Sequence, residues 1–310
     1  MKKIFIDTVV KENANAGSKA TRDCAEILSR NGYKRLAICV QKSSPLKTFL
    51  SLAKVLFSIK PMTHILIQYP LSYRLFVPYS VSVVCKFKRC KLSILIHDII
   101  SLRGKEYCLQ KEMNVLKKAD NIIVHNDEML SWLSSYIHNS RFYILQLFDY
   151  LIERPSRKSS FGNIVVFAGN LQKSAFLNRV NTLGIKMNLY GAEVENIKSI
   201  CNDNVKYKGT FKSDDLSALV GNWGLVWDGT SLDSCDGIYG EYLKYNAPHK
   251  MSLYIVAGLP IIIWEQAAES KFITDNKLGI AVSSLYEVSD ILKRITEVEY
   301  NEISLSTKIV

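Results

Sequence analysis

Residues 242–260 read Tyr242-Leu-Lys-Tyr-Asn-Ala-Pro-His-Lys-Met-Ser-Leu-Tyr-Ile-Val-Ala-Gly-Leu-Pro260, and the apolar run Ile261–Trp264 follows them. This order predicts a polar loop, the start of one buried helix, a Gly-Pro stop and a strand. The first backbone N–H groups of a helix lack intrahelical acceptors and form the positive end of its dipole, so a helix start can bind phosphate. Asn246, His249 and Lys250 add polar and cationic side chains there, which makes this stretch a candidate phosphate site.

Strands alternate with helices on both sides of this stretch. In the first half, strands are predicted at Ile4–Ile6, Arg35–Val40, Thr63–Gln68, Lys91–Ile96, Asn121–Val124 and Phe142–Leu145. In the second half, they are predicted at Ile164–Phe167, Ile185–Leu189, Val205–Tyr207, Gly224–Trp227, Pro260–Ile263 and Gly279–Val282. The polar segment Glu153–Ser160 separates the two series and is the predicted linker. Regular alternation predicts two doubly wound α/β domains, residues 1–152 and 161–310.

Composition narrows the class of partner without choosing one. The formal net charge of +11 suits an anionic partner, which is a nucleic acid, an anionic membrane surface or a phosphorylated substrate. The seven cysteines are scattered without a CxxC pair or a zinc spacing, so free thiols in a reducing cytoplasm are predicted. The apolar run after Met1 is short and interrupted by Asp7, so it predicts a strand rather than a signal peptide.

Polar groups or glycine follow five of the predicted strands. Parallel sheets bind ligands at the carboxyl ends of their strands, which makes these positions candidate site residues. They are Asp7 with the loop to Gly17, His97-Asp98, Ala168-Gly169-Asn170, Asp228-Gly229 and Glu265. Because two of them lie in the first half and three in the second, a cleft between the halves would be lined by both domains.

Lys250 is the strongest single functional candidate. A cation in the first turns of a helix is unfavourable with the helix dipole unless an anion is present, so its position favours phosphate binding over a merely solvated side chain. Asn246 can be the cap of the same helix, and a capping residue can still bind a ligand.

The other candidates have structural alternatives, and for Asp98 the structural alternative is the commoner one. Asp98 can be an N-cap, although His97 and Asp98 together at a strand end suit proton transfer. Asp228 can form a turn beside its glycine. Gly17 can open a turn before a helix, or it can let the backbone approach a phosphate.

Seven stretches carry a family resemblance, and they run in order over nearly the whole chain. They are Ala16–Ala20 with Asp23, Ile96–Ile99 with Leu102–Gly104, Phe148–Leu151, Phe167–Leu171, Leu225–Gly229, Gly240–Lys250 and Ser252–Tyr254. On these motifs and their spacing, the chain resembles the bacterial β-1,6-galactofuranosyltransferases of O-antigen and capsule assembly. It resembles more distantly the glucosyltransferases that extend glycans on serine-rich adhesins.

The resemblance implies a GT-B fold, in which two Rossmann-like domains face each other across a cleft. The donor, a UDP-sugar, would bind mainly to the second domain and the acceptor to the first. The resemblance implies no metal and no cofactor, and it implies inversion by direct displacement. The family pattern also ends in a helix that crosses back to the first domain, and no such segment is evident after the helix predicted around Tyr286–Ile295.

The resemblance also suggests roles for individual residues. Asp98 is the predicted base for the acceptor hydroxyl, with His97 as the second choice. Lys250 would stabilise the leaving UDP. The remaining residues predicted to bind the donor are Asn246, Lys244, Tyr242, Glu241, Gly169, Asn170, Asp228 and Gly17.

Several functional alternatives remain open at this level. The donor sugar can be galactofuranose or, in a glucosyltransferase of glycoprotein glycan extension, glucose. A nucleotide-binding protein without transferase activity is a candidate of a different class. The sequence shows no GxGxxG after the first strand and no nucleic-acid-binding motif, which argues against a nicotinamide enzyme and a nucleic-acid binder.

The expected acceptor is a glycan, commonly lipid-linked and presented at the inner face of the membrane, and a homo-oligomer is also considered. The segment Lys47–Lys60 mixes lysines with apolar residues, and Lys86, Lys88, Arg89 and Lys91 form a basic cluster that can contact anionic lipid. The alternative for the apolar residues of Lys47–Lys60, which the sequence favours, is a helix that packs them on a sheet.

Overall fold

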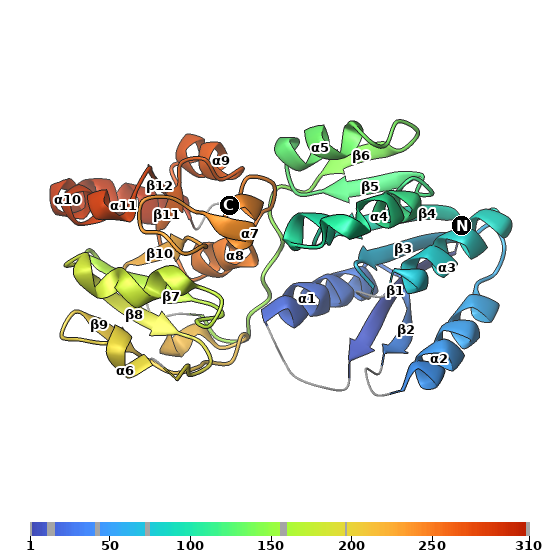
Figure 1. Cartoon of the computed structure of the whole chain (residues 1–310), viewed down its shortest axis with the longest axis horizontal. Helices are drawn as coiled ribbons and strands as arrows, with labels where there is room; N and C mark the ends of the chain where they lie inside the picture. The colour runs from blue at the N-terminus through green and yellow to red at the C-terminus, as the bar shows by residue number, and fades with distance from the viewer. Residues whose placement is uncertain are drawn as a thin grey trace. The chain divides into compact units, whose positions relative to one another are not determined.

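The computed structural model describes residues 2–10, 16–40, 44–71, 75–155, 160–195 and 197–307. The chain forms two compact units, Met1–Gln146 and Leu147–Val310 (Figure 1). Each unit contains one six-stranded sheet, and every strand pair in both sheets is parallel.

The sheet of the first unit has the strand order β2-β1-β3-β4-β5-β6. Its strands are β1 Lys3–Val10, β2 Lys34–Val40, β3 His64–Tyr69, β4 Lys91–Ile96, β5 Asn121–Val124 and β6 Arg141–Ile144. Its helices are α1 Ala16–Arg30, α2 Pro45–Ser58, α3 Phe76–Phe87, α4 Leu109–Leu116 and α5 Asp127–Ser134. The chain reverses its direction across the sheet between β1 and β3, so this is the point where a doubly wound sheet binds ligands.

The sheet of the second unit has the order β12-β11-β10-β7-β8-β9. Its strands are β7 Ile164–Ala168, β8 Lys186–Tyr190, β9 Val205–Tyr207, β10 Trp223–Val226, β11 Ile261–Trp264 and β12 Gly279–Val282. Its helices are α6 Ile197–Ile200, α7 Gly237–Tyr242, α8 His249–Val256, α9 Ser270–Asp275, α10 Val288–Arg294 and α11 Glu297–Ser306. The order is that of a dinucleotide-binding sheet, and its switch point lies between β7 and β10.

All twelve strands predicted from the sequence are present in the structure. Their strongest signal is a short apolar run, as in β4 and β11, where most residues are buried. Strands covered on both faces read as continuous apolar runs, which is why this signal was sufficient. The predicted α/β fold of two doubly wound domains is confirmed.

Tyr254 of α8 joins the two strands at the switch point of the second unit. Its hydroxyl accepts a hydrogen bond from the Ala168 N–H at 2.9 Å and donates one to the Leu225 carbonyl at 3.2 Å. Gly224 of β10 lies under the ring of Tyr254, and a Cβ atom at Gly224 would collide with that ring. Burial raises the pKa of the Tyr254 hydroxyl, so it stays protonated and keeps both bonds.

The second unit begins earlier in the chain than the linker predicted at residues 153–160. Phe148 and Tyr150 are already buried, and Tyr150 belongs to the hydrophobic core of the second unit. The Glu153 N–H donates a hydrogen bond to the Asp214 carbonyl at 2.7 Å. Polar composition suggested a free linker, but these contacts tie residues 148–154 to the second unit. Residues 156–159 of the predicted linker lie outside the described residues.

Two helices were not predicted from the sequence. One is α3, and the other is α11, which begins with a capping box between Thr296 and Glu299. Tyr300 of α11 packs against Trp223 at 5.4 Å between ring centroids, and its hydroxyl donates to the Asn222 carbonyl. The last described helix therefore packs on the second unit. Over the described residues, no helix has both the length and the apolar character needed to cross a membrane.

Candidate active site

Helix α8, which follows the polar loop 243–248, begins at the switch point of the second unit. Pro248 precedes α8 in an extended conformation, and among the described residues no side chain caps this helix start. Gly258, with φ of +70°, ends the helical turn after α8 and leads into β11. The predicted order of loop, helix start, buried helix, stop and strand is therefore confirmed, and the first backbone N–H groups of the helix lie at this end.

Lys250 lies in the first turn of α8 and reaches across the ends of two neighbouring strands. Its Nζ is 3.0 Å from Asp228 Oδ2, and it donates to the Trp227 carbonyl at 3.2 Å. It also lies 4.8 Å from the ring centroid of Phe167 on β7. The structure brings the predicted residues Lys250 and Asp228 together, and the Lys250 side chain is 14% exposed.

The ion pair changes how the position of Lys250 is explained. A cation near the start of a helix opposes the dipole, and the sequence argument required an anion to offset this. Asp228 supplies a negative charge from within the protein, so the dipole argument alone does not demand a bound phosphate. The position of Lys250 still favours a phosphate site, because the lysine lies at the end of the sheet where parallel strands bind ligands.

Asn246 supplies an independent sign of a ligand. Its side-chain Oδ1 is buried, and no described residue donates a hydrogen bond to it. A buried acceptor without a donor costs free energy, so such an atom commonly meets a ligand or an ordered water. Asn246 lies three residues before the start of α8, close in sequence to Lys250.

Gly169 and Asn170 follow β7, which pairs with β10 in the sheet. Asp228, the ion-pair partner of Lys250, follows β10. A Cβ atom at Gly169 would meet nothing closer than the Phe167 ring at 3.8 Å. The space beside the backbone is therefore open to a close approach. The Asn170 Oδ1 atom accepts a hydrogen bond from the Lys173 N–H at 3.2 Å, and its side chain is exposed.

The other predicted donor residues form a second local group. Lys244 Nζ is 2.7 Å from Glu241 Oε2 and lies 5.4 Å from the ring centroid of Trp264. Tyr242 is only 4% exposed, so most of its side chain packs within the protein. Direct contact of these three residues with a donor stays a prediction.

Gly17 is the second residue of α1 and adjoins residues 11–15, which lie outside the described part of the chain. Its predicted role in phosphate binding therefore stays a prediction. Two residues later, Lys19 forms an ion pair with Asp23 in which both side chains are buried. Across the described residues, no three His, Cys, Asp or Glu side chains gather in a way that could hold a metal ion.

Two features near the site were not predicted from the sequence. The ring of His249 stacks on Tyr150 with centroids 4.9 Å apart, so the segment that opens the second unit supports the start of α8. Asp236 accepts hydrogen bonds from the Thr230 and Ser231 N–H groups and from the Thr230 hydroxyl, which fixes the loop after β10. Burial alone would raise the pKa of Asp236, but these hydrogen bonds lower it below its ordinary value. The Asp-Gly pair at 228–229 was the only sequence signal for this loop.

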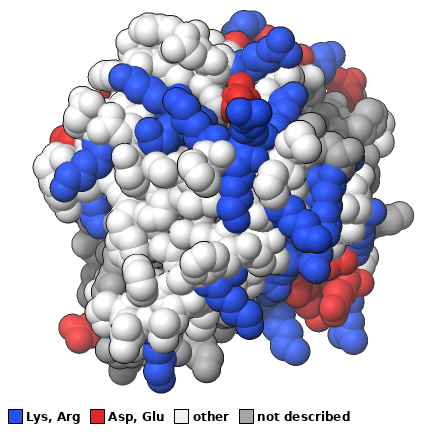
Figure 2. Space-filling view, turned by 90° about the vertical axis from the view of Figure 1, so that its right-hand side faces the viewer, with Lys and Arg blue, Asp and Glu red and all other residues white. Residues whose placement is uncertain are grey.

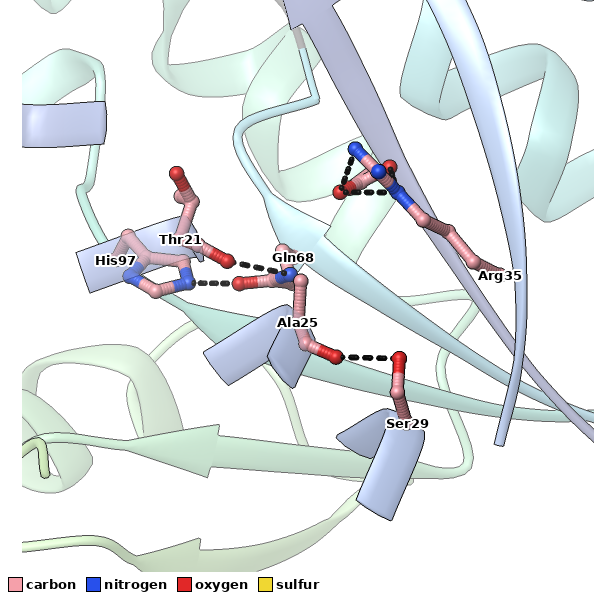
Figure 3. A network of polar contacts seen from close by, with 7 residues as sticks. Thr21, Ala25, Ser29, Arg35, Gln68 and His97 are labelled. Carbon is pink, nitrogen blue, oxygen red and sulfur yellow. Dashed lines mark hydrogen bonds and ion pairs between the residues drawn. The ribbon is translucent and has the colours of Figure 1, made fainter. Parts of the chain in front are cut away.

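In the first unit, His97 follows β4 and belongs to a polar chain that spans three elements (Figure 3). Its Nε2 lies 2.7 Å from Gln68 Oε1, and the Gln68 amide donates to the Thr21 carbonyl at 3.2 Å. Because the amide oxygen can only accept, His97 Nε2 carries the proton. The other ring nitrogen, Nδ1, is buried.

Asp98 differs from its neighbour because its carboxylate is partly open to solvent. Its side chain is 28% exposed and accepts a charged hydrogen bond from Arg103. The loop that carries both residues is held by Glu112 of α4, which is fully buried. Glu112 accepts hydrogen bonds from the N–H groups of Ile100 and Ser101, from the Ser101 hydroxyl and from the Tyr69 hydroxyl. Glu112 was not predicted from the sequence.

Comparison with solved structures places this fold in a known class. An alpha-glucosyltransferase in complex with UDP-glucose and DNA containing an abasic site matches with a TM-score of 0.60 and 12% identity, over 98% of this chain and 93% of that chain. Two doubly wound domains of this kind define the GT-B class of glycosyltransferase fold.

Sequence comparison identifies the family within this class. The models described as "Glucosyltransferase 3-like" match residues 3–147 with the N-terminal domain and residues 165–310 with the C-terminal domain. The Beta-1,6-galactofuranosyltransferase WbbI of Escherichia coli (strain K12) is 31% identical over 323 residues, 99% of this chain and 92% of the relative. Glucosyltransferase 3 of Streptococcus gordonii is 26% identical over 224 residues, 70% of this chain and 65% of the relative. The chain belongs to the glucosyltransferase 3-like family and is a glycosyltransferase.

Proposed function

We propose that this enzyme transfers galactofuranose from UDP-galactofuranose to a glucoside on a growing surface polysaccharide and forms a β-1,6 linkage. The observation that carries the proposal is Lys250 at the start of α8, at the switch point of the second sheet. The choice of sugar and linkage rests on the relative of 31% identity, whose name states both.

In the proposed reaction, the acceptor hydroxyl oxygen attacks the anomeric carbon as the bond from that carbon to the diphosphate breaks. UDP leaves with the bonding electrons, and the hydroxyl proton passes to the enzyme. Lys250 and the first N–H groups of α8 stabilise the negative charge that develops on UDP, which is commonly the largest contribution to catalysis. One displacement inverts the anomeric configuration, and this fixed cation takes the role that a metal ion has in other transferases.

Asp98 is the proposed base. Its carboxylate is 28% exposed, whereas His97 uses Nε2 to donate to Gln68 and has Nδ1 buried. A base must come within hydrogen-bond reach of the proton that it accepts, and only the accessible group meets this condition in the present arrangement. Arg103 then positions the carboxylate.

The donor would lie against the described groups of the second unit. The unpaired Asn246 oxygen can accept a hydrogen bond from a sugar or ribose hydroxyl. The open space beside Gly169 admits the diphosphate or the nucleotide. A lipid-linked glycan is the proposed acceptor class.

A second candidate is a UDP-glucose-dependent glucosyltransferase that extends protein-linked glycans, and the match to Glucosyltransferase 3 favours it. A screen of UDP-galactofuranose, UDP-galactose and UDP-glucose with a glucoside acceptor separates the two. We expect turnover with UDP-galactofuranose, a β-linked product by NMR and the same rate in the presence of EDTA. Turnover with UDP-glucose alone would select the second candidate, and UDP binding without turnover on any donor would favour a nucleotide-binding protein.

A further inference from the structure

Helix α2 directs a row of large apolar side chains to solvent. Thr48, Leu52 and Val55 are buried and attach the helix to the sheet. On its other sides, Leu46, Phe49, Leu50 and Phe57 are exposed, with Phe57 at 87%. Packing of the apolar residues on the sheet, the alternative that the sequence favoured, therefore accounts for only part of this helix.

Helix α3 has the same property and lies beside α2. Phe76, Tyr79, Val83 and Phe87 are exposed at helical spacing, and Phe87 is also 87% exposed. Lys88 joins the ends of the two helices, because its Nζ donates to the carbonyls of Leu56 and Ile59 at 2.9 and 2.6 Å. Two neighbouring helices thus each expose large apolar side chains, and we call their exposed residues together the α2–α3 face.

The segment that carries this face has charges of a single sign. Between Ile27 and His97 the sequence contains eight lysines and four arginines, and no aspartate or glutamate. The cations Lys47, Lys54, Lys60, Lys86 and Arg89 are all exposed, and none forms an ion pair with a described carboxylate. Figure 2 shows lysine and arginine spread among uncharged side chains over this end of the first unit, with few acidic residues.

We propose that the α2–α3 face docks on an anionic lipid surface. Its apolar residues would enter the boundary between headgroups and acyl chains, while the surrounding lysines and arginines contact acidic headgroups. Large exposed apolar patches on soluble proteins mark interaction sites, and the charge around this one is complementary to anionic lipid. The proposal does not depend on the donor sugar or on the transfer reaction.

A lipid surface fits this face better than other partners do. In a two-fold dimer the same patch meets itself, so the lysines of one copy would face the lysines of the other without a carboxylate between them. Nucleic acid would use the cations and could stack on the aromatic rings, but Leu46, Leu50 and Val83 offer it no stacking surface. Aliphatic, aromatic and cationic side chains together suit the membrane interface.

The test is co-sedimentation of the full-length enzyme with vesicles. We expect binding to vesicles of phosphatidylcholine and phosphatidylglycerol at about 0.1 M salt, weak binding to phosphatidylcholine alone and release near about 1 M salt, where charges are screened within a few ångströms. A protein that fails to bind the mixed vesicles at low salt would overturn the proposal.

Variants assign the binding to this face. The change Phe57→Ser with Phe87→Ser should weaken partition by about tenfold or more, and Lys47→Gln with Lys54→Gln by about fivefold for each lysine. Matched controls are Val298→Ser with Leu305→Ser, two exposed apolar residues of α11, and Lys271→Gln with Lys293→Gln, two exposed lysines of the second unit. The controls should partition as the wild type does.

Three outcomes contradict the proposal even if vesicles are bound. Equal partition of the Phe57/Phe87 variant and the wild type would place the contact elsewhere. Light scattering that shows dissociation of an oligomer in this variant, with no loss of partition, would assign the face to a second copy. Complete displacement from vesicles by a DNA oligomer, with tighter binding to the DNA, would assign it to nucleic acid. Unchanged UDP affinity and melting temperature in all variants exclude misfolding as the cause.

Discussion

Lys250 pairs with the carboxylate of Asp228 at the start of α8, and in the proposed reaction it also binds a phosphate of the donor. We predict that Lys250→Met weakens UDP binding by about tenfold to a hundredfold, because a hydrogen bond to a charged group contributes about 1.5–3 kcal/mol. Isothermal titration of UDP measures the effect. Lys271→Met, which removes an exposed lysine paired with Asp275 on α9, is the control and should bind as the wild type does. Unchanged affinity in Lys250→Met would remove the phosphate assignment.

Asp98 is expected to act on the acceptor and not on the donor. Asp98→Asn keeps the size of the side chain and removes its capacity to accept a proton, so kcat should fall by about a hundredfold or more while UDP affinity is retained. His97→Asn should lower kcat less, because the Nδ1 atom of the His97 ring is buried. A full transfer rate in Asp98→Asn would show that another group is the base.

His125 predicts how the stability of the enzyme depends on pH. Its Nε2 donates to the Ile96 carbonyl, and burial lowers its pKa to about 4, although that hydrogen bond acts in the opposite direction. A histidine in the unfolded chain has a pKa of about 6.5, so between these two pKa values the unfolded chain binds a proton that the folded chain does not. The free energy of unfolding should therefore be unaffected by this group above about pH 6.5 and should fall by roughly 3 kcal/mol towards pH 4.

Denaturation in urea at several pH values measures this fall. His125→Asn should reduce it, because the asparagine does not titrate, whereas His138→Asn at an exposed position should leave it unchanged. An equal pH dependence in His125→Asn and the wild type would show that other groups cause it.

At the scale of an element, Glu112 holds the loop that carries Asp98. One carboxylate oxygen accepts from the Ser101 N–H at 2.9 Å and from the Ser101 hydroxyl at 2.6 Å. In Glu112→Gln an amide NH2 group replaces one of the two carboxylate oxygens. The negative charge is lost, and the NH2 group, itself a donor, then faces the N–H and O–H donors that the oxygen had accepted from. We expect the free energy of unfolding to fall by about 2 kcal/mol and the transfer rate to fall with it. Chemical denaturation tests this, with the exposed Glu106→Gln as the control.

Strands were predicted well from the sequence where a short run of apolar residues marked them. The strands β4, β5, β9 and β12 begin and end at the predicted residues, because each is a short run of mostly apolar residues. Helix α3 was missed because its residues, Phe-Val-Pro-Tyr-Ser-Val-Ser-Val-Val-Cys-Lys-Phe, include a proline and four valines, which do not favour a helix. Its exposed apolar face also removes the polar periodicity that identifies a surface helix.

The surroundings of the candidate residues were predicted only in part, because their contacts join distant segments. Strand ends and the start of α8 gave Lys250 and Asp228 as candidates in the second unit, and His97 and Asp98 in the first. The partners that define their chemistry could not be found in the same way. Gln68 lies 29 residues from His97, and Glu112 lies 11 residues from Ser101. Such pairs depend on strand order and side-chain direction, which a pattern of apolar residues does not determine.

At the scale of the whole molecule, the two units should respond differently to the donor nucleotide. A ligand that binds only the folded state of one unit stabilises that unit. We predict that UDP slows amide hydrogen exchange most at residues 167–171, 227–230 and 249–254 of the second unit. Mass spectrometry of peptic fragments with and without UDP measures this. Protection confined to the first unit would contradict the assignment of the donor to the second.

The single-signed rim of the α2–α3 face also has a consequence for handling the protein in solution. Apolar patches of this size tend to adhere to each other, but like charges around them repel approaching copies. Salt shortens the range of that repulsion from about 10 Å at 0.1 M to about 3 Å at 1 M. The lysines and arginines should therefore keep the enzyme dispersed, and we expect concentrated stocks to turn cloudy when the ionic strength is raised and to clear again on dilution.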